Sequence, residues 1–269
     1  MLIIGERVNA TRKVPRNAIT QRDAATIADE IRKQEKAGAD YIDLNAGTGQ
    51  GDSNQEGEDL SWLVDVALET TEKPFCLDAS DPAVIAAAAA HLGDRRPWML
   101  NSVKCEPEVL EPGLELAAAH KAPVVALAMD ETGIPRDAES RLSACRRIYE
   151  AAMRHGIAPG DLFFDPLVFP ISADIAQGMV TLCTLQGIKR EFPEAKTTMG
   201  ASNFSYGLPK RAELNRTFLA AAITHGLDSA ICDPTRPSIR RALVLGDLIA
   251  GQDRHCRRYN RAVKRGLFD

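Results

Sequence analysis

The chain has 269 residues, 45% of them hydrophobic and 5% aromatic, and its formal net charge is −4 at pH 7. This length suits one (β/α)8 barrel of about 250 residues, so we expect residues 1–269 to form a single domain. The acidic balance, the absence of a long basic run and the scarcity of aromatic residues argue against nucleic acid as a partner.

Eight short apolar runs predict buried strands. In chain order they are residues 2–4, 41–44, 75–77, 98–100, 124–127, 162–164, 197–199 and 229–232. Segments with helical spacing of apolar residues lie between most of them, at 22–37, 59–71, 138–155, 175–191, 211–225 and 239–250, and Asp81-Pro82 opens an alanine-rich helix. Residues 107–120 fit a helix less well, because Pro112-Gly113 interrupts them. Strand alternating with helix predicts an α/β fold with parallel strands, here a TIM barrel.

Polar side chains recur where these predicted strands end. They are Asp43, Asn45, Asp78, Asn101, Asp165 and Asn203. Because the carboxyl ends of barrel strands meet at one rim, we expect these groups to converge on a pocket. Carboxylates and amides without His, Lys or Cys suit a neutral nitrogen heterocycle better than a phosphate or a metal.

Two loops are expected at the same rim. Residues 47–57 are polar and glycine-rich, and they fit a lid or partner-contact loop as well as a solvated connector. Residues 129–136 follow the fifth predicted strand and are placed to fold over the rim.

Cysteines, histidines and apolar runs indicate neither a metal site nor a membrane segment. The six cysteines and five histidines lack the spacings of zinc or iron–sulfur ligands, so we predict no metal. Cys76 and Cys232 are expected in the core. The apolar start at residues 1–4 is too short for a signal peptide and the run at 83–90 too short to span a bilayer, so we expect a cytoplasmic location.

A series of motifs at the predicted strand ends is similar to a known family. The motifs are IGERVN at 4–9, DLNAG at 43–47, CLD at 76–78, LNS at 100–102, TGIP at 132–135, FDPL at 164–167, GASN at 200–203 and LNRTFL at 214–219. In this order they resemble the pterin-binding methyltransferases, and most closely the single-domain methyltetrahydrofolate:corrinoid methyltransferases. The resemblance covers essentially the whole chain.

The resemblance implies an enzyme that moves a methyl group between N5 of 5-methyltetrahydrofolate and the cobalt of a corrinoid, in a direction it leaves open. It implies that Asp78, Asn101 and Asp165 bind the pterin ring and that Asn203 lies near N5, with Asn203 and Asp165 in catalytic roles. Further expected pterin contacts are Asn9, Ser202 and Arg211. Aspartates suit this task, because they accept hydrogen bonds from the N–H groups of a 2-amino-4-oxo pterin.

Structural roles would also explain these residues. Asp78 and Asp165 precede helical segments and would serve as helix caps, while Asn101 and Asn203 would stabilise loops as amides. Arg211 would reach the folate tail, stack on the pterin, or stay solvated at a helix start.

The corrinoid is expected to come from outside the chain. No cobalamin-binding motif of the Asp-x-His-x-x-Gly kind occurs, so we expect a corrinoid protein or free cobalamin as a partner, and a homodimer as the assembly. Two alternatives stay open. Dihydropteroate synthase shares the pterin barrel, although Ser202-Asn203-Phe204 stands where its Ser-Arg-Lys motif is expected, and a non-catalytic pterin-binding subunit would need the same pocket.

Overall fold

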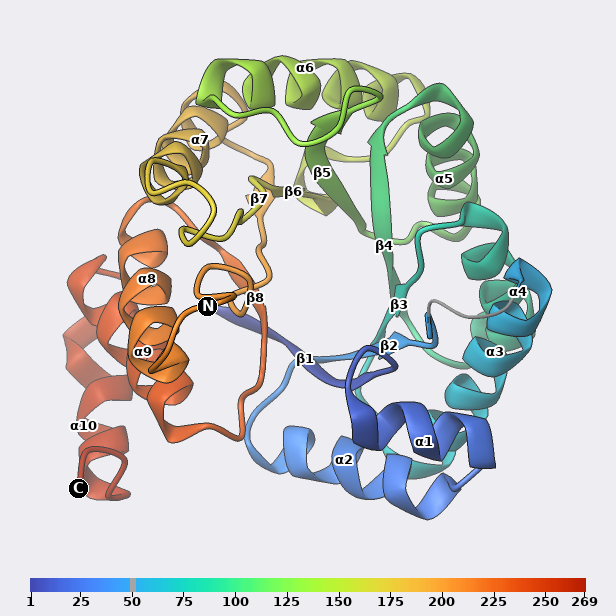
Figure 1. Ribbon diagram of the computed structural model, residues 1–269, viewed down its shortest axis with the longest axis horizontal. Helices are drawn as coiled ribbons and strands as arrows, with labels where there is room; N and C mark the ends of the chain where they lie inside the picture. Colours follow the sequence, from blue (N-terminus) through green and yellow to red (C-terminus); the bar gives the residue numbers. More distant parts are fainter. Residues whose placement is uncertain (49–51) are drawn as a thin grey trace.

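Eight parallel strands form a barrel, and the connecting helices surround it (Figure 1). The computed structural model describes residues 1–48 and 52–269. Within them the strands are β1 (Leu2–Asn9), β2 (Tyr41–Asn45), β3 (Phe75–Asp78), β4 (Trp98–Cys105), β5 (Val124–Asp130), β6 (Leu162–Asp165), β7 (Lys196–Thr197) and β8 (Ser229–Cys232). From β1 to β7 each strand pairs with the next one in the chain, and β1 also pairs with β8. The predicted TIM barrel is confirmed.

The barrel closes between β7 and β8 through very few hydrogen bonds. The strand predicted at 197–199 is regular only over Lys196–Thr197, so the seam depends on the residues that follow it. Ile231 donates its backbone N–H to Met199 at 2.9 Å and accepts from Ala201 at 3.1 Å. These two bonds fix the start of the loop that carries Asn203.

Helices follow every strand in the described residues. They are α1 (Lys13–Gln21), α2 (Ala24–Lys36), α3 (Ser53–Thr70), α4 (Pro82–Leu92), α5 (Pro107–His120), α6 (Ala138–Arg154), α7 (Gln177–Glu191), α8 (Arg211–Thr224), α9 (Pro237–Ile249) and α10 (Arg257–Lys264). The sequence prediction missed α1 and α10 and placed the others within a few residues, apart from α3. None of these helices is both long enough and apolar enough to span a membrane.

Helix α3 starts six residues earlier than predicted. Asp52 accepts a hydrogen bond from the backbone N–H of Gln55 at 2.9 Å and so caps the helix at Ser53. The glycine-rich segment predicted as one loop over 47–57 is therefore partly helical, while 49–51 lie outside the described residues. Helix α5 continues through Pro112, and the next residue, Gly113, packs so closely on β4 that a Cβ there would lie 2.5 Å from the Val103 side chain.

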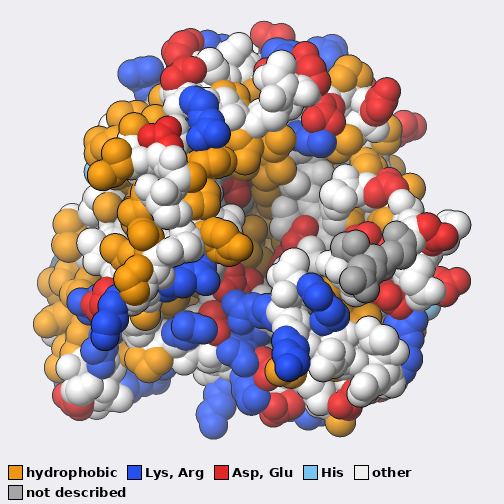
Figure 2. All heavy atoms as spheres, viewed as in Figure 1, with side chains coloured by type: hydrophobic (Ala, Val, Ile, Leu, Met, Phe, Trp, Pro, Cys, Tyr) orange, Lys and Arg blue, Asp and Glu red, His pale blue; other side chains and the backbone are white. Residues whose placement is uncertain are grey.

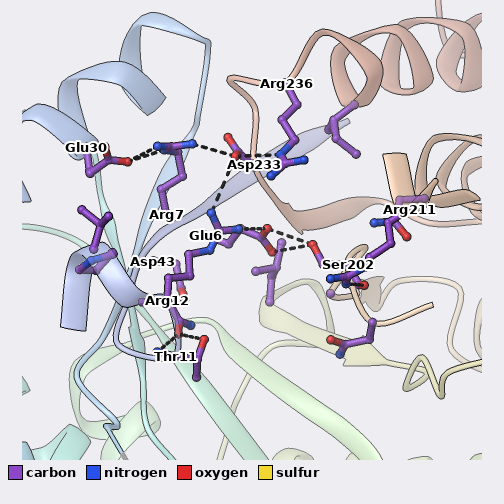
Figure 3. Close-up of a pocket in the computed structure, with 18 of the residues that line it drawn as sticks. Glu6, Arg7, Thr11, Arg12, Glu30, Asp43, Ser202, Arg211, Asp233 and Arg236 are labelled. Atoms are coloured by element: carbon purple, nitrogen blue, oxygen red, sulfur yellow. Dashed lines mark hydrogen bonds and ion pairs between the residues drawn. The ribbon is translucent and has the colours of Figure 1, made fainter. Parts of the chain in front are cut away.

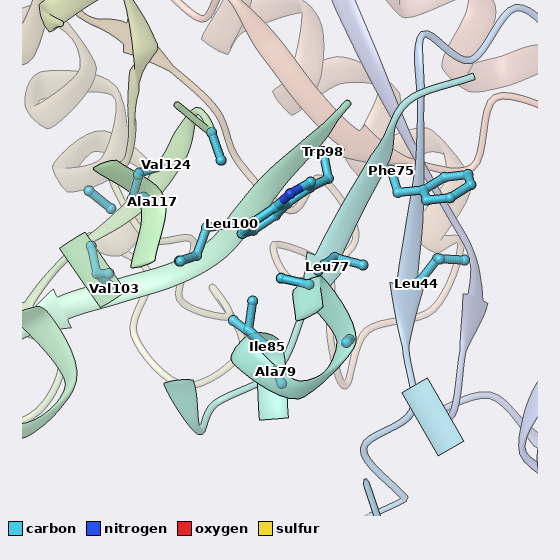
Figure 4. Packing of buried hydrophobic residues seen from close by; sticks show 14 of the residues in the cluster. Leu44, Phe75, Leu77, Ala79, Ile85, Trp98, Leu100, Val103, Ala117 and Val124 are labelled. Carbon is cyan, nitrogen blue, oxygen red and sulfur yellow. The ribbon is translucent and has the colours of Figure 1, made fainter. Parts of the chain in front are cut away.

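Apolar side chains fill two layers, one inside the barrel and one between strands and helices. The inner cluster consists of Ile4, Cys76, Met99, Val125 and Phe163. In the outer layer, Leu77 and Leu100 from the strands lie near Ile85 of α4 and Ala117 of α5 (Figure 4). Burial of one such large side chain contributes about 1.5–3 kcal/mol, so the two layers hold the strand ends in fixed positions. Cys76 and Cys232 are buried as predicted.

Candidate functional site

A cavity of about 1070 Å3 opens at the carboxyl ends of the strands. The space-filling view shows this end of the barrel hollowed at its centre (Figure 2). The ends of β1, β2 and β3 line the cavity, together with the first turns of α1, α8 and α9. Five predicted site residues are brought together there: Asn9, Asp78, Ser202, Asn203 and Arg211.

Asp78 lies at the end of β3 and faces the cavity. Burial raises the pKa of its carboxyl to about 6, a hydrogen bond with the Asn45 side chain opposes the rise, and the charge of Glu56 adds to it. The alternative role of a helix cap is not realised, because Asp81 caps α4 instead. Asp78 is thus a buried hydrogen-bond acceptor that is mostly ionised at neutral pH.

Asp43 lies beside Asp78 and is completely buried, although it also lines the cavity. Burial raises the pKa of its carboxyl well above the usual range, and the charge of Asp78 raises it further. Cys76 and Asn101 are polar neighbours that counteract this rise, yet neither meets hydrogen-bond geometry with a carboxylate oxygen of Asp43. A buried polar group without a hydrogen-bond partner destabilises the folded protein, so these two oxygens are available to accept hydrogen bonds from a ligand or from water.

Asn101 and Asp165 are buried but do not line the cavity. Asp165 ends β6 as predicted, whereas Asn101 lies in the middle of β4, because that strand continues to Cys105 beyond the predicted end at residue 100. Asp165 accepts a hydrogen bond from the backbone N–H of Leu167 at 2.8 Å. Burial raises the pKa of its carboxyl to about 6, although this bond, the nearby charge of Arg141 and the backbone of Gly200 oppose the rise. Asp165 therefore holds the start of the loop after β6. It caps no helix, since α7 begins after Ala176.

Ser202, Asn203 and Arg211 lie in and just after the loop that leaves the seam. Ser202 donates its hydroxyl to Glu6 of β1 at 3.0 Å. Arg211 donates to the backbone oxygen of Ser202 at 2.7 Å and to the Ser205 hydroxyl at 3.0 Å (Figure 3). Asn203 is exposed at the cavity wall. The loop thus holds an amide at the mouth while its neighbours are fixed.

A network of charged residues crosses the cavity wall, and the sequence prediction assigned it no role. Arg7 of β1 pairs with Glu30 of α2 and, at 2.9 Å, with Asp233 after β8, while Arg12 pairs with Glu6 (Figure 3). The signal was present in the sequence, because Glu6 and Arg7 directly follow an apolar run.

A local irregularity allows these two charged residues to stand within β1. The pairing register of β1 and β2 shifts between Gly5 and Val8. The Oε1 atom of Gln34 accepts a hydrogen bond from the backbone N–H of Arg7 at 2.9 Å. A Cβ on Gly5 would lie 2.4 Å from this oxygen. Glycine is required there for Gln34 to hold the strand.

Arg141 of α6 was also not predicted as a site residue. It stabilises the loops at the carboxyl ends of β5 and β6. Its side chain is fully buried and donates to the backbone oxygens of Pro135, Pro166 and Leu167 at 2.8–3.0 Å, and to Gln177 at 2.7 Å. Burial lowers the pKa of its guanidinium to about 10, so it remains charged at neutral pH. One cation therefore joins the loops after β5 and β6 to α7.

No group of three His, Cys, Asp or Glu side chains in residues 1–48 and 52–269 is arranged to hold a metal ion. The cavity wall presents carboxyl, amide and hydroxyl groups together with Lys and Arg side chains, several of which are paired with carboxylates.

Comparison with known proteins identifies the family. The sequence profile of the pterin binding enzymes matches residues 5–233. A methylcorrinoid:tetrahydrofolate methyltransferase from Eubacterium limosum is 34% identical over 268 residues, which are 99% of this chain and 97% of that protein. Methionine synthase from Mycobacterium tuberculosis is 32% identical over 86% of this chain, which corresponds to 20% of the larger protein.

Solved structures show the same fold. Dihydropteroate synthase from Stenotrophomonas maltophilia aligns with a TM-score of 0.71 at 20% identity and 92% coverage of both chains. The enzyme from Yersinia pestis aligns with a TM-score of 0.69 at 19% identity and 93% coverage of both. These two likenesses concern the barrel alone. The family match and the near full-length relative show that the chain belongs to the pterin-binding enzymes and, within them, to the tetrahydrofolate and corrinoid methyltransferases.

Proposed function

We propose that this chain transfers a methyl group between N5 of 5-methyltetrahydrofolate and the cobalt of a corrinoid supplied from outside the chain. The observation that carries the proposal is the set of acceptor and amide groups on β2, β3, β4 and β6, in and next to an open cavity at the carboxyl ends of the strands. The near full-length relative supports the same reaction class. Residues 1–269 act as a single domain in this proposal.

The pterin ring is proposed to bind against Asp78, with Asn101 and Asp165 completing the contacts. Ionised Asp78 accepts hydrogen bonds from ring N–H groups, and such charge-assisted bonds are about twice as strong as neutral ones. Asn101 and Asp165 are buried before the ligand arrives, so the ring reaches them by insertion toward the barrel floor or through water. Asn9 and Ser202 stand at the wall, where their own bonds to Thr11 and Glu6 fix them.

Asn203 is proposed to stabilise the charge that develops at N5 as the methyl group departs. A tertiary amine leaves poorly, so N5 needs a hydrogen bond or a proton in the transition state. The Asn203 amide is placed at the open mouth, where the methyl group must face the incoming cobalt centre. The proton comes through water, in a network that includes Asp165.

The corrinoid is treated as a second substrate, whose cobalt accepts or donates the methyl group. A corrinoid protein or free cobalamin supplies it at the open mouth. The cytoplasmic location and the homodimer stay predictions.

The test is single-turnover methyl transfer. Purified protein is mixed with 5-methyltetrahydrofolate and Co(I) cobalamin, and the loss of the Co(I) absorbance is followed, with calorimetric titration of the folate alone as the companion measurement. Binding with transfer supports the proposal. If the protein binds the folate but transfers no methyl group in either direction, with cobalamin or with a corrinoid protein, it is a non-catalytic pterin-binding subunit. Absence of folate binding would refute the pterin assignment.

Dihydropteroate synthase activity is the second candidate, favoured by the common barrel. The same preparation is incubated with a dihydropterin diphosphate and p-aminobenzoate. We expect no product, because Asn203 stands where the diphosphate-binding motif was expected.

A further inference from the structure

We propose that a basic stripe on helix α10 is a docking surface for an acidic protein partner, the protein that carries the corrinoid. The inference rests on the proposed function, because it assigns a surface to the second reactant of the same methyl transfer. The stripe consists of Arg257, Arg258, Arg261, Lys264 and Arg265.

The carboxyl-terminal segment has a charge opposite to that of the rest of the chain. Residues 251–269 contain six Lys and Arg against two Asp and Glu, whereas residues 1–250 contain 27 Lys and Arg against 35 Asp and Glu. The excess positive charge of an acidic protein is thus confined to one short segment. Such a local field attracts an anionic surface and orients it toward that segment.

The cations of this segment lie on one face of the helix. At about 100° per residue, the five side chains of the stripe fall within an arc of about 120°. All five residues are exposed. Arg258 pairs with Asp247 of α9, but the other four form no ion pair with a carboxylate in residues 1–48 and 52–269. Their charge is therefore available to a partner.

The other face of α10 contacts the protein itself. The ring centroids of Tyr259 and Phe268 are 5.5 Å apart, and Leu267 is buried. Val263 is the one large apolar residue of this helix that is exposed, which is too little apolar surface to hold the helix in a bilayer. The stripe also contains no aromatic ring on which a nucleobase would stack. An acidic protein surface fits these arginines better, because carboxylates accept paired hydrogen bonds from guanidinium groups.

The stripe extends toward the end of the barrel at which the cavity opens. Helix α10 lies on the outer side of α9 (Figure 1), and Arg258 contacts Asp247 in the last turn of α9. Beyond the end of α10, the backbone oxygen of Leu267 accepts a hydrogen bond from Arg241 in the second turn of α9, at 2.6 Å. The two helices are therefore antiparallel. Arg241 is three residues, about 4.5 Å of helix rise, from Ser238 at the cavity wall.

A protein that covers the cavity mouth also reaches the end of the stripe. A standard protein interface buries about 800 Å2 on each partner, a patch about 30 Å across. Packed helices lie about 8–10 Å apart, so α10 is only one helix farther out than α9, whose first turn lines the cavity. The corrinoid must reach this mouth to meet N5 of the folate. Its carrier is thus the acidic partner that the position of the stripe favours.

The test compares a corrinoid carried by a protein with a free one. Transfer to tetrahydrofolate is measured at low salt from methylcobalamin and from the methylated corrinoid protein with which the native chain exchanges methyl groups. The proteins are the native chain, Arg261→Glu with Arg265→Glu, and Arg261→Gln with Arg265→Gln. The matched control is Arg32→Glu with Lys36→Glu on α2, two exposed cations that are also four residues apart and do not line the cavity.

With the corrinoid protein, we expect kcat/KM to fall about 10- to 100-fold in the Glu pair and about 3- to 10-fold in the Gln pair, since attraction between charged surfaces accelerates association. The control should stay within about 2-fold of the native chain. With free methylcobalamin, every variant should stay within about 2-fold, because the cavity is unchanged. Higher salt should slow the native reaction with the corrinoid protein. Poly-L-glutamate, a defined acidic competitor, should inhibit that reaction alone.

A native rate of the Glu pair with the corrinoid protein, or an equal loss with free methylcobalamin, would overturn the inference and leave the proposed function intact. The same holds if the native chain exchanges methyl groups with free cobalamin but with no corrinoid protein.

Binding assays cover the other occupants of the stripe. RNA, vesicles of phosphatidylcholine with about one quarter phosphatidylglycerol, and self-association in sedimentation are measured for the native chain and the Glu pair. A loss of any of these in the Glu pair, with transfer from the corrinoid protein unchanged, would assign the stripe to that occupant and overturn the inference. If the native chain transfers methyl groups with neither form of the corrinoid, the proposed function fails, and the inference fails with it.

Discussion

The hydroxyl of Ser202 and the carboxylate of Glu6 join the loop after β7 to the first strand of the barrel, at 3.0 Å. Burial raises the pKa of Glu6, and Arg12 and Ser202 counteract that rise. The residue next to Asn203 is therefore held by an anchor on β1, on the far side of β8. Positioning of Asn203 depends on this bond.

Replacing Ser202 with Ala removes the anchor. The free energy of unfolding should fall by about 0.5–1.5 kcal/mol, the value of one hydrogen bond, and the methyl-transfer rate should fall about 2- to 10-fold because Asn203 is held less well. Single-turnover kinetics and denaturant unfolding check both. Ser202→Thr keeps a hydroxyl and should recover most of the rate; equal losses in the Ala and Thr variants would contradict an anchoring role.

Asn203→Ala addresses the proposed transition-state contact. We expect the transfer rate to fall about 10- to 1,000-fold, as for loss of one preorganised donor, with a smaller loss of folate affinity. The rate is measured at saturating folate beside a binding titration, with the exposed Asn260→Ala on α10 as the control. A rate loss that disappears at saturation would reduce Asn203 to a binding residue.

The raised pKa of Asp78 predicts how stability varies with pH. An unfolded aspartate has a pKa near 3.9, whereas Asp78 titrates at about 6 in the folded protein. The folded state binds more protons between these values, so this group lowers the free energy of unfolding as pH rises through that window.

Asp78→Asn should therefore be more stable than the native chain at pH 8, by about 1–3 kcal/mol, and the difference should shrink toward pH 4. Urea unfolding at several pH values measures it, with the exposed Asp94→Asn as a control that should show no such trend. The same variant should bind folate more weakly, because a charged acceptor is lost. A stability difference independent of pH would contradict the assigned titration.

Arg141→Met tests the support beneath the rim. It removes the donor of three backbone oxygens and of the Gln177 side chain, although the Leu167 oxygen still accepts from Thr181, so we expect a loss of about 2–5 kcal/mol in the free energy of unfolding. Thermal and denaturant unfolding give the value. Arg141→Lys should recover only part of it, since an ammonium group cannot reach all these acceptors. If the Met variant loses less than about 1 kcal/mol in the free energy of unfolding, the loops are stable without the Arg141 hydrogen bonds.

The barrel was predictable because its strands are short apolar runs that end in polar residues. The run at 229–232 coincides with β8, and Asp78 and Asp165 end their strands as predicted. Helix α1 was missed, because the segment from Lys13 to Gln21 has no side-chain cap and too few apolar residues at helical spacing for a helix to be predicted. The helix break predicted at Pro112 was wrong, since this helix is stabilised by contacts that only the tertiary structure supplies.

The site was predictable where a residue acts by its place at a strand end. Asp78 and Asn203 were predicted in this way, and both line the cavity, Asp78 at the end of β3 and Asn203 in the loop after β7. Arg141 and the pairing of Arg7 with Asp233 were not, because these contacts join residues far apart in the chain. Spacing along a sequence carries no information on which distant charges meet.

The seam between β7 and β8 gives the barrel a preferred place to open. Its backbone pairing consists of two hydrogen bonds around Ile231, supplemented by side-chain bonds of Thr197 and Ser229, while the β1–β8 contact on the other side of β8 continues over four residue pairs. Amide hydrogens at Ile231 and Ala201 should therefore exchange with deuterium faster than those at the β1–β8 contact. Local opening at this edge moves the Asn203 loop without unfolding the rest of the barrel. The mobility needed to admit two large reactants is then confined to this loop, which is the segment expected to contact both of them.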